Sequence, residues 1–387
     1  MASALRDHRG VIDPRGIVDP QRVDELLSSG RTLPAVFYTD ATIARLEDQL
    51  IFRQAWQLAG SVVELAKPGD YVTLRISTVP IVVVRGKDEQ IRAFVNVCSH
   101  RAQTIVTGEG ACANLQCRYH GWTYGLDGHL TGVPAWRTAD LPPFEELGLT
   151  PIPVEVWAGL VFVAIEPECS LVDQLGDLPR VMRETGYDFP FETVPGISYL
   201  GSYDYTIKAN WKVYQENSSE CYHCPTSHPG TFGELFDFTR VHLDAVSFND
   251  GGGSFGPFPM RPEIRDRFPG TKAGSQYGYA QYYLWPNTLI VSGFVGEALF
   301  RMEPVTAGSM RQTGRGYSRP DAINAELSQL IDVTFAQTTS EDIAIVERVQ
   351  EGLESGMYES GPTAADREIL LRDFHGRVWS SLRPAFD

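Results

Sequence analysis

The sequence predicts an α+β protein in which a small antiparallel β domain precedes a larger domain of helices packed on an antiparallel sheet. Residues 55–165 contain short runs of β-branched residues separated by turn residues, a pattern typical of small sheets. After residue 165, longer helical patterns alternate with aromatic strands, which indicates helices on one side of a sheet. The chain has 387 residues, which is long enough for two domains.

The expected elements follow from local patterns. Asp40 is the predicted N-cap of an amphipathic helix of about three turns. This helix belongs to an N-terminal segment, residues 1–54, that is expected to pack on the second domain. Strands of the β domain, residues 55–165, are expected at Tyr71–Ile76, Pro80–Arg85, Ile91–Val97 and Gly159–Ile165. In the second domain, residues 166–387, we expect a helix at Asn210–Cys224, strands within Tyr277–Ser292, a long helix within Asp321–Glu354 and a loop at Gly251–Gly253.

Charge and hydropathy argue against several classes of function. The net charge of −16 disfavours binding to nucleic acid or an anionic membrane, because phosphates would be repelled over most of the surface. No segment has the roughly 18 to 20 consecutive apolar residues of a membrane span, and residues 1–20 lack the apolar stretch of a signal peptide. Six cysteines are too few for a disulfide scaffold in so long a chain. We therefore expect a cytoplasmic protein whose cysteines serve a metal.

Two cysteines and two histidines are spaced like metal ligands. Cys98 and His100 form C-x-H, and after 16 intervening residues Cys117 and His120 form C-x-x-H. Two thiolates and two imidazoles on paired loops can hold either zinc or a [2Fe–2S] cluster in which two histidines bind one iron. The tight C-x-H spacing and the lack of a following helix favour the cluster, with a zinc site as the alternative.

A second group of ligands is predicted from the pattern E-x-x-H-x₄-H, formed by Glu220, His223 and His228. If Asn210–Cys224 is helical, Glu220 and His223 lie one turn apart, so the carboxylate can hydrogen-bond the imidazole. Pro225 would end this helix and allow His228 to approach the same ion from the next turn. Two histidines leave an Fe(II) facial triad short of one carboxylate.

The missing carboxylate is predicted on the long C-terminal helix. Asp342 shares its helix face with the apolar Ile345 and Val346, where an acid is costly unless a partner such as a metal pairs with it. Glu341 is interpreted as its solvated neighbour. Asp342 is therefore the predicted third ligand.

Two other patterns near these residues receive simpler interpretations. Cys221 and Cys224 form a C-x-x-C without a second pair, and we interpret both as packing around the iron site rather than as a redox or zinc motif. Alternating aromatic residues in Tyr277–Trp285 could form a cage for a cation, although half-buried strand residues are the favoured interpretation.

The sequence resembles the Rieske oxygenase family. The matching segments are Asn96–Arg101, Cys117–Tyr124, Leu126–Gly128, Asn210–Lys212, Glu216–Asn217, the E-x-x-H-x₄-H motif and Glu341–Gln350. The resemblance implies a Rieske β domain placed before a catalytic domain of the helix-grip type. It also implies two cofactors, a [2Fe–2S] cluster and a mononuclear Fe(II).

The resemblance assigns the cluster ligands individually. Cys98 and Cys117 would bind one iron, and His100 and His120 would bind the other. Ala102 departs from the family pattern, because many members have Gly after the arginine, and the local turn could differ as a result.

For the catalytic domain, the resemblance implies that His223, His228 and Asp342 bind the mononuclear iron. Glu220 would bridge His223 to the Rieske His120 of a neighbouring subunit in a head-to-tail homotrimer. Most members have Asp at this bridge. Glu220 within its surrounding residues looks instead like the branch that oxidises quaternary amines such as glycine betaine, carnitine and stachydrine.

The function implied is that of an oxygenase component. It would use O₂ and electrons from a separate NAD(P)H-dependent reductase or ferredoxin to hydroxylate a small substrate, by oxidative N-demethylation or hydroxylation of a quaternary or tertiary amine. Dihydroxylation of an aromatic ring is the alternative within enzymes. A Rieske electron carrier would leave the second group of ligands unexplained, and a zinc-stabilised binding module would contain no iron.

Overall fold

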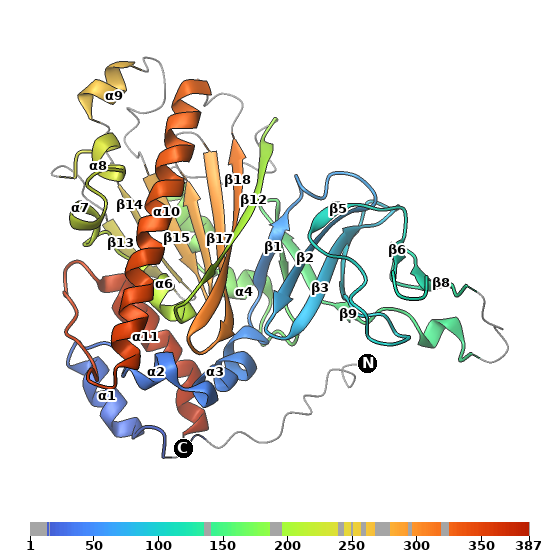
Figure 1. The fold of residues 1–387 in the computed structure, drawn as a ribbon, viewed down its shortest axis with the longest axis horizontal. Coiled ribbons are helices and arrows are strands. Elements are labelled where there is room, and N and C mark those ends of the chain that lie inside the picture. The colour runs from blue at the N-terminus through green and yellow to red at the C-terminus, as the bar shows by residue number, and fades with distance from the viewer. Residues whose placement is uncertain are drawn as a thin grey trace.

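The computed structural model (Figure 1) describes residues 14, 16–134, 141–185, 196–238, 244–248, 251–256, 261–267, 279–292, 296–318 and 325–386. A smaller part built from short strands lies beside a larger part in which helices pack on a long twisted sheet. The predicted α+β class is confirmed. Within the described ranges, no helix is both long and apolar enough to cross a lipid bilayer.

The N-terminal segment is helical. Its elements are α1 (Pro20–Ser28), α2 (Val36–Thr39), α3 (Ala41–Glu47) and the π-helical turn η1 (Asp48–Phe52). Asp40 is the N-cap of α3, because its carboxylate accepts hydrogen bonds from the N–H groups of Thr42 and Ile43 at 2.6 and 3.2 Å.

The smaller part contains three antiparallel sheets. One sheet has the order β1 (Gln57–Ser61), β11 (Leu160–Val163), β10 (Val154–Trp157). The second has the order β5 (Glu109–Ala111), β2 (Asp70–Ile76), β3 (Val79–Arg85), β4 (Ile91–Val95), β9 (Pro151–Ile152). The third is a small ribbon of β6 (Leu115–Gln116), β7 (Thr123–Tyr124) and β8 (Leu130–Gly132), followed by the 3₁₀ turn η3 (Phe144–Glu146). Each strand predicted here overlaps an observed one.

The larger part is built on a seven-stranded antiparallel sheet. Its order is β12 (Ser198–Ile207), β18 (Ser309–Ser318), β17 (Gly296–Thr306), β16 (Thr288–Ser292), β15 (Tyr279–Leu284), β14 (Gly251–Gly256), β13 (Asp244–Phe248). The strand β14 contradicts the predicted loop at Gly251–Gly253. A Cβ at Gly253 would lie 2.7 Å from the Tyr282 ring, so glycine permits the close packing of this strand on its neighbour.

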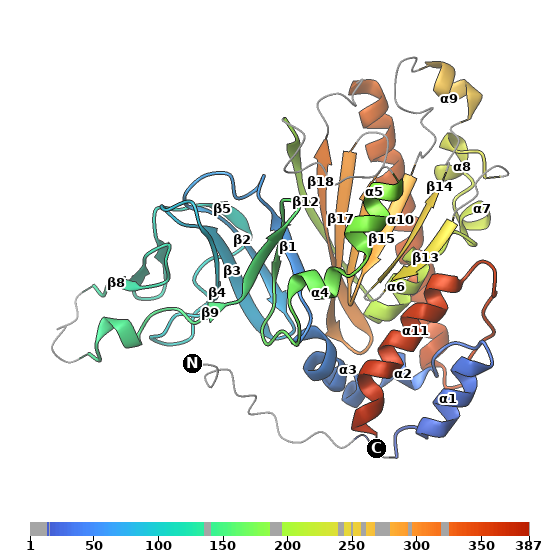
Figure 2. The ribbon, with the colours of Figure 1, turned by 180° about the vertical axis from the view of Figure 1, so that it is seen from behind.

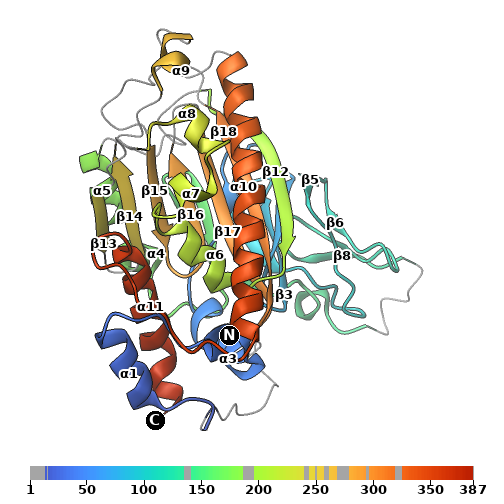
Figure 3. The same cartoon turned by 60° about the vertical axis from the view of Figure 1, so that its left-hand side comes forward.

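Different elements cover the two faces of this sheet. One face is covered by α6 (Trp211–Ser218), α10 (Ala325–Glu354) and α11 (Ile369–Leu382), which ends in the 3₁₀ turn η5 (Arg383–Ala385) (Figure 3). The other face packs against α4 (Leu171–Leu175), α5 (Leu178–Thr185) and the strands β1 and β11 (Figure 2). The short helices α7 (Cys224–Ser227), α8 (Phe232–Leu235) and α9 (Pro262–Arg267) lie at one end of the larger part.

The predicted helix at Asn210–Cys224 is shorter than expected. It ends at Ser218, because the hydroxyls of Ser218 and Ser219 donate to the carbonyls four residues earlier, at 2.9 and 2.7 Å, and compete with the backbone there. Pro225 does not end this helix. It lies in the first turn of α7, where proline is well tolerated because no N–H is needed.

Charged side chains of the large sheet hold the smaller part in place. Glu303 on β17 accepts the N–H of Arg75 on β2 at 3.1 Å, and Arg301 donates to the carbonyl of Arg75 at 2.9 Å. Arg301 and Glu303 also pair with each other at 2.6 Å, and both are about 5 % exposed. The contact between the two parts therefore includes a buried ion pair bonded to the backbone of β2.

A second buried ion pair joins the N-terminal segment to α6. Lys212 Nζ lies 2.5 Å from Glu47 Oε1, and Trp211 Nε1 donates to the other oxygen of Glu47 at 2.8 Å. The Lys212 and Glu47 side chains are 0 % and 2 % exposed, and burial lowers the pKa of Lys212.

We predict that Glu47→Gln destabilises the protein by about 3–5 kcal/mol, because it leaves the buried Lys212 ammonium without its counter-charge. Replacing both residues, as Glu47→Gln with Lys212→Met, should recover most of this loss. The matched control is Asp88→Asn, which breaks an exposed pair with Arg92 and should cost much less than Glu47→Gln. Urea unfolding measures all three variants, and equal effects of Glu47→Gln and Asp88→Asn would contradict the prediction.

Candidate metal centres

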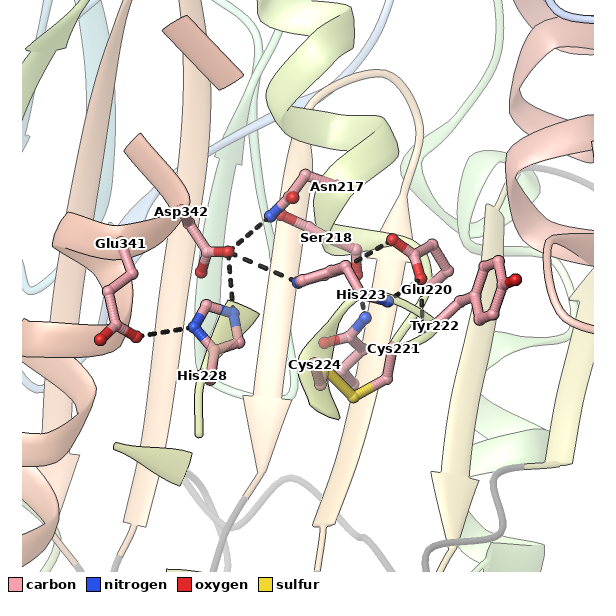
Figure 4. Close-up of a disulfide and its surroundings, with 11 residues drawn as sticks. Asn217, Ser218, Glu220, Cys221, Tyr222, His223, Cys224, His228, Glu341 and Asp342 are labelled. Atoms are coloured by element: carbon pink, nitrogen blue, oxygen red, sulfur yellow. Dashed lines mark hydrogen bonds and ion pairs between the residues drawn. A yellow bond between two sulfur atoms is a disulfide. The ribbon is translucent and has the colours of Figure 1, made fainter. Parts of the chain in front are cut away.

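Two histidines and an aspartate converge at the helix-covered face of the large sheet (Figure 4). His223 Nε2 and His228 Nε2 lie 3.5 and 3.2 Å from Asp342 Oδ1. One ligand atom from each of the three residues lies within 4.8 Å of the others. His223 precedes α7, His228 follows it, and Asp342 projects from α10. The structure thus brings together the three residues that the sequence predicted for this site.

The outer nitrogens of both rings bind carboxylates. His223 Nδ1 lies 2.5 Å from Glu220 Oε1, and His228 Nδ1 lies 2.8 Å from Glu341 Oε2. Thr231 also donates to Glu341 Oε2 at 2.7 Å. The interpretation of Glu341 as a solvated neighbour is therefore wrong, because its side chain turns from α10 toward the His228 loop.

The sequence analysis missed Glu341 because it considered only which helix face carries Asp342. Neighbouring helix residues lie about 100° apart around the axis, so Glu341 can contact a loop that packs beside the helix. The role of Glu341 could have been predicted from His228, because a metal-binding histidine needs an acceptor for its other ring nitrogen. Asn217 was also given no role, and its amide donates to Asp342 Oδ1 at 2.9 Å.

A turn rather than a helix places Glu220 beside His223. The Glu220 carboxylate accepts the N–H groups of Tyr222 and His223 while its other oxygen contacts the His223 ring. The predicted contact between Glu220 and His223 is present, although the continuous helix that was its expected basis is absent. Glu220 is only 10 % exposed on its side chain.

The cluster of acids and imidazoles shifts the pKa values of its members. Burial would lower the pKa of His223, but the hydrogen bonds that its ring donates to Asp342 and Glu220 outweigh this effect and raise the pKa to about 9. Burial would raise the pKa of Asp342, but bonds from both histidines and Asn217 lower it to about 2. The pKa of His228 is raised by Asp342 and Glu341 against the effect of burial. These opposing effects show strong attraction between the carboxylates and positive charge.

The donor set fits a divalent metal ion. Two Nε2 atoms and one carboxylate converge, and both rings have their other nitrogen fixed by a carboxylate, as histidine ligands of metals usually do. Two histidines and one carboxylate are the facial triad that suits Fe(II). The residues present therefore match the iron expected at this position.

Cys221 and Cys224 do not remain separate thiols. The structure joins them in a disulfide with a Cα–Cα distance of 5.1 Å, within the normal range for such a bond. The interpretation of both as independent packing residues is wrong, because the turn before α7 brings the two side chains together. The disulfide spans Tyr222 and His223 at the edge of the site (Figure 4).

A cavity of about 90 Å³ lies beside these residues. Its apolar wall includes Phe232, Phe300 and Phe335, and the described lining contains no lysine or arginine. The strand that could have formed a cation cage contributes Gln281 to the cavity, but none of its described aromatic side chains. Tyr282 and Tyr283 are fully buried in the cores on opposite faces of the sheet, while Tyr277 lies outside the described residues.

The second predicted site lies in the smaller part, on two loops. Cys98 and Cys117 are 2 % exposed free thiols, and burial together with the adjacent Cys98 thiol raises the pKa of Cys117. The His100 and His120 rings lie beside each other with centroids 4.6 Å apart. Two buried sulfurs and two neighbouring imidazoles on paired loops fit a [2Fe–2S] cluster with mixed ligands.

The two loops have the same hydrogen-bond pattern. In the first, Ala102 N donates to Cys98 O and Cys98 N donates to Gln103 O, and the second repeats this between Cys117, Gly121 and Trp122. Gly121 has φ +74°, and Ala102 holds the equivalent position at φ +58°. The departure at Ala102 therefore leaves the turn unchanged, at the cost of a left-handed conformation that alanine adopts less readily than glycine.

Neighbouring side chains complete the surroundings of the predicted cluster ligands. Trp122 stacks on His100 with ring centroids 4.8 Å apart. The Tyr124 hydroxyl lies 3.3 Å from Cys98 Sγ and accepts the N–H of Ser99 at 3.0 Å. Burial raises the pKa of Tyr124 to about 12, so its hydroxyl stays protonated and can donate to the sulfur. His120 is exposed, which leaves one edge of this site open to solvent.

The fold and the two sites define an iron–sulfur protein with a separate mononuclear metal site, which is the composition of an oxygenase. Comparison of the sequence with protein families agrees. Residues 55–148 match the Rieske [2Fe-2S] domain, and residues 196–383 match the ring hydroxylating alpha subunit (catalytic domain).

Characterised proteins with similar sequences are oxygenase subunits. The carnitine monooxygenase oxygenase subunit of Acinetobacter baumannii is 30% identical over 89% of this chain and 91% of its own length. The glycine betaine monooxygenase oxygenase subunit of Chromohalobacter salexigens is 34% identical over 89% of this chain and 84% of its own. The crystal structure of the quaternary ammonium Rieske monooxygenase CntA with L-carnitine superposes with a TM-score of 0.77 at 26% identity, covering 94% of this chain and 99% of that one. The chain belongs to the Rieske non-haem iron oxygenases.

Membership in this family establishes the general activity. The protein is an oxygenase subunit with a Rieske [2Fe–2S] domain and a catalytic domain that binds mononuclear iron. It acts on a small molecule and depends on a separate reductase for electrons.

We predict that Glu341→Gln weakens binding of Fe(II) by about 10 to 100-fold, because the neutral amide holds the His228 ring less firmly than a carboxylate. The control is Glu351→Gln, an exposed acid on the same helix, which should leave the affinity unchanged. Titration of the metal-free protein with Fe(II) measures both. Unchanged affinity in Glu341→Gln would show that the contact with His228 contributes nothing to metal binding.

Proposed function

We propose that this protein oxidises a C–H bond beside the nitrogen of a small quaternary or tertiary amine. His223, His228 and Asp342 hold the mononuclear iron, and Cys98, Cys117, His100 and His120 hold the cluster. The observation that carries the proposal is the convergence of His223 Nε2, His228 Nε2 and Asp342 beside a cavity. Similarity to carnitine and glycine betaine monooxygenase subunits supports the amine as substrate.

The balanced reaction consumes one O₂, two electrons and two protons. When bound, the iron activates O₂ and the cluster supplies electrons one at a time. One oxygen atom enters the C–H bond and the other leaves as water. The hydroxylated carbon then separates from nitrogen, giving formaldehyde and the demethylated amine. The protein holds the imidazoles in place with Glu220 and Glu341, and its phenylalanine wall excludes water from the cavity.

The charges of the site favour a cationic substrate. Three carboxylates lie at the two histidines, from Glu220, Glu341 and Asp342. A divalent ion offsets two of these charges and leaves one for a positively charged amine. The described lining contains no basic side chain that would repel such a substrate.

We also propose that electrons cross between chains of a homotrimer. Within one chain, the loops beside β6 and β8 that carry the cluster ligands lie at the far end of the smaller part from α7 and α10 (Figures 1 and 2). Glu220 sits at the rim beside the exposed Tyr222, where a neighbouring subunit could approach it. In this arrangement Glu220 contacts His223 of its own chain and the His120 of a neighbouring subunit.

The test of the function combines metal analysis with turnover. The purified protein should be red-brown and contain about three irons per chain. With an added reductase, small quaternary and tertiary amines should cause coupled consumption of O₂ and NADH with release of formaldehyde. Conversion of aromatic compounds to diols without any reaction of amines would contradict the proposed substrate class, and zinc without iron would contradict the proposed metals.

We predict that replacing His223, His228 or Asp342 with Ala abolishes product formation but leaves the visible spectrum of the cluster intact, because the two sites lie in different parts of the fold. Cys98→Ser is the converse variant and should lose the spectrum. Absorption spectroscopy with product analysis measures both. Bleaching in the Asp342→Ala variant would contradict the assignment of separate metals to the two sites.

We predict that Glu220→Gln, measured with its iron site saturated, keeps the cluster and the trimer but blocks oxygenation, if Glu220 spans two chains. The test mixes two inactive variants, His223→Ala and Cys98→Ser, because a mixed trimer can place an intact cluster beside an intact iron of another chain. Recovery of activity supports transfer between chains. No recovery, with mixed trimers verified by mass spectrometry, would restrict the electron path to one chain.

A further inference from the structure

Two buried polar atoms line the active-site cavity apart from the proposed iron ligands. Gln312 Oε1 and Thr338 Oγ1 have no hydrogen-bond partner among the described residues. Their side chains are 1 % and 5 % exposed, and both residues line the cavity. A buried polar group without a partner is unfavourable, so native proteins rarely leave one unsatisfied. The partner of these atoms is therefore expected inside the cavity.

Gln312 reaches the cavity from the large sheet. It lies on β18 opposite Met302 and shares a sheet face with Phe300, another residue of the cavity wall. Its side chain is close enough to Tyr214 to lower the pKa of that tyrosine, which burial raises. The amide oxygen of Gln312, which can only accept, has no donor among the described residues.

Gln312 and Thr338 both lie near the residues of the proposed iron site. Thr338 precedes Asp342 by one turn of α10, so their Cβ atoms are about 6 Å apart. Tyr214, which lines the same cavity as Gln312, precedes Asn217 by three residues on α6, and Asn217 donates a hydrogen bond to Asp342. The amide oxygen thus approaches from the sheet and the hydroxyl from the helix.

We propose that Gln312 and Thr338 bind a hydrogen-bond donor of the substrate, either a hydroxyl or the N–H of a protonated amine. This inference rests on the proposed function and narrows its substrate class. The donor would lie about one helical turn from Asp342, while apolar walls such as Phe232 and Phe335 contact the rest of the molecule. A fully methylated ammonium group has no N–H, so a quaternary substrate satisfies these residues with a hydroxyl.

The experiment measures dissociation constants by calorimetry on the iron-loaded enzyme without dioxygen. Two pairs of ligands are compared, and only the first member of each pair has a hydrogen-bond donor. Choline and its methyl ether test a hydroxyl, and dimethylpropylamine and trimethylpropylammonium test an N–H. In at least one pair, the wild type should bind the ligand with the donor about tenfold more tightly than the ligand without it. The pair that shows this preference identifies whether the donor group is a hydroxyl or an N–H. Equal binding within these two pairs and within the amine-free pair described below overturns the inference, as does tighter binding of the members that lack a donor.

Two variants assign the preference to the named residues. Gln312→Leu should reduce the preference for the ligand with a donor to less than about threefold. The isosteric Thr338→Val should also reduce this preference, with little disturbance of the fold. Glu351→Gln changes an exposed residue of α10 outside the cavity and should leave the preference unchanged. A preference that survives both Gln312→Leu and Thr338→Val shows that other groups bind the donor and overturns the proposal.

A third pair separates failure of this inference from failure of the proposed function. Benzyl alcohol and benzyl methyl ether differ in the same donor but carry no amine. If only benzyl alcohol shows the preference and Gln312→Leu removes it, the inference stands and the amine substrate is wrong. If no pair shows a donor preference while amines are demethylated, the proposed function stands and the inference is wrong.

Discussion

The catalytic centre depends on two hydrogen bonds that hold histidine rings from outside. Glu220 and Glu341 bind the Nδ1 atoms of His223 and His228, so that both Nε2 atoms point at Asp342. The arrangement gathers the carboxylates of Glu220, Glu341 and Asp342 in a partly buried site, which is unfavourable without a cation. The turn before α7, the position of α10 and the close packing of α6 on the sheet all serve to keep these groups together.

Much of the fold could be predicted because it follows from local chemistry. Asp40 is an N-cap for the reason expected, and the β-branched runs before residue 100 form strands as their alternation indicates. The cluster loops were recognisable because Cys98, His100, Cys117 and His120 keep the spacing that two metal-binding turns require. Asp342 was identifiable because an acid on an apolar helix face needs a partner.

The remaining features depend on contacts between distant segments, which spacing does not encode. The contact of Glu341 with His228 requires knowing how α10 packs beside the α7 loop. The end of α6 at Ser218 depends on hydroxyl groups that compete for backbone carbonyls, although the same residues are tolerated in many helices. The disulfide between Cys221 and Cys224 depends on the turn that replaces the expected helix.

The ion pair of Arg301 and Glu303 has a consequence for the motion of the smaller part. Both side chains form hydrogen bonds with the backbone of Arg75. A rotation of the smaller part would therefore leave two buried charges without these backbone partners. Each chain is therefore expected to behave as one rigid body. If electrons cross between chains, the tunnelling distance is set by the association of whole subunits. In such an enzyme, separation of the subunits would stop electron transfer, because no domain motion within a chain could shorten the distance.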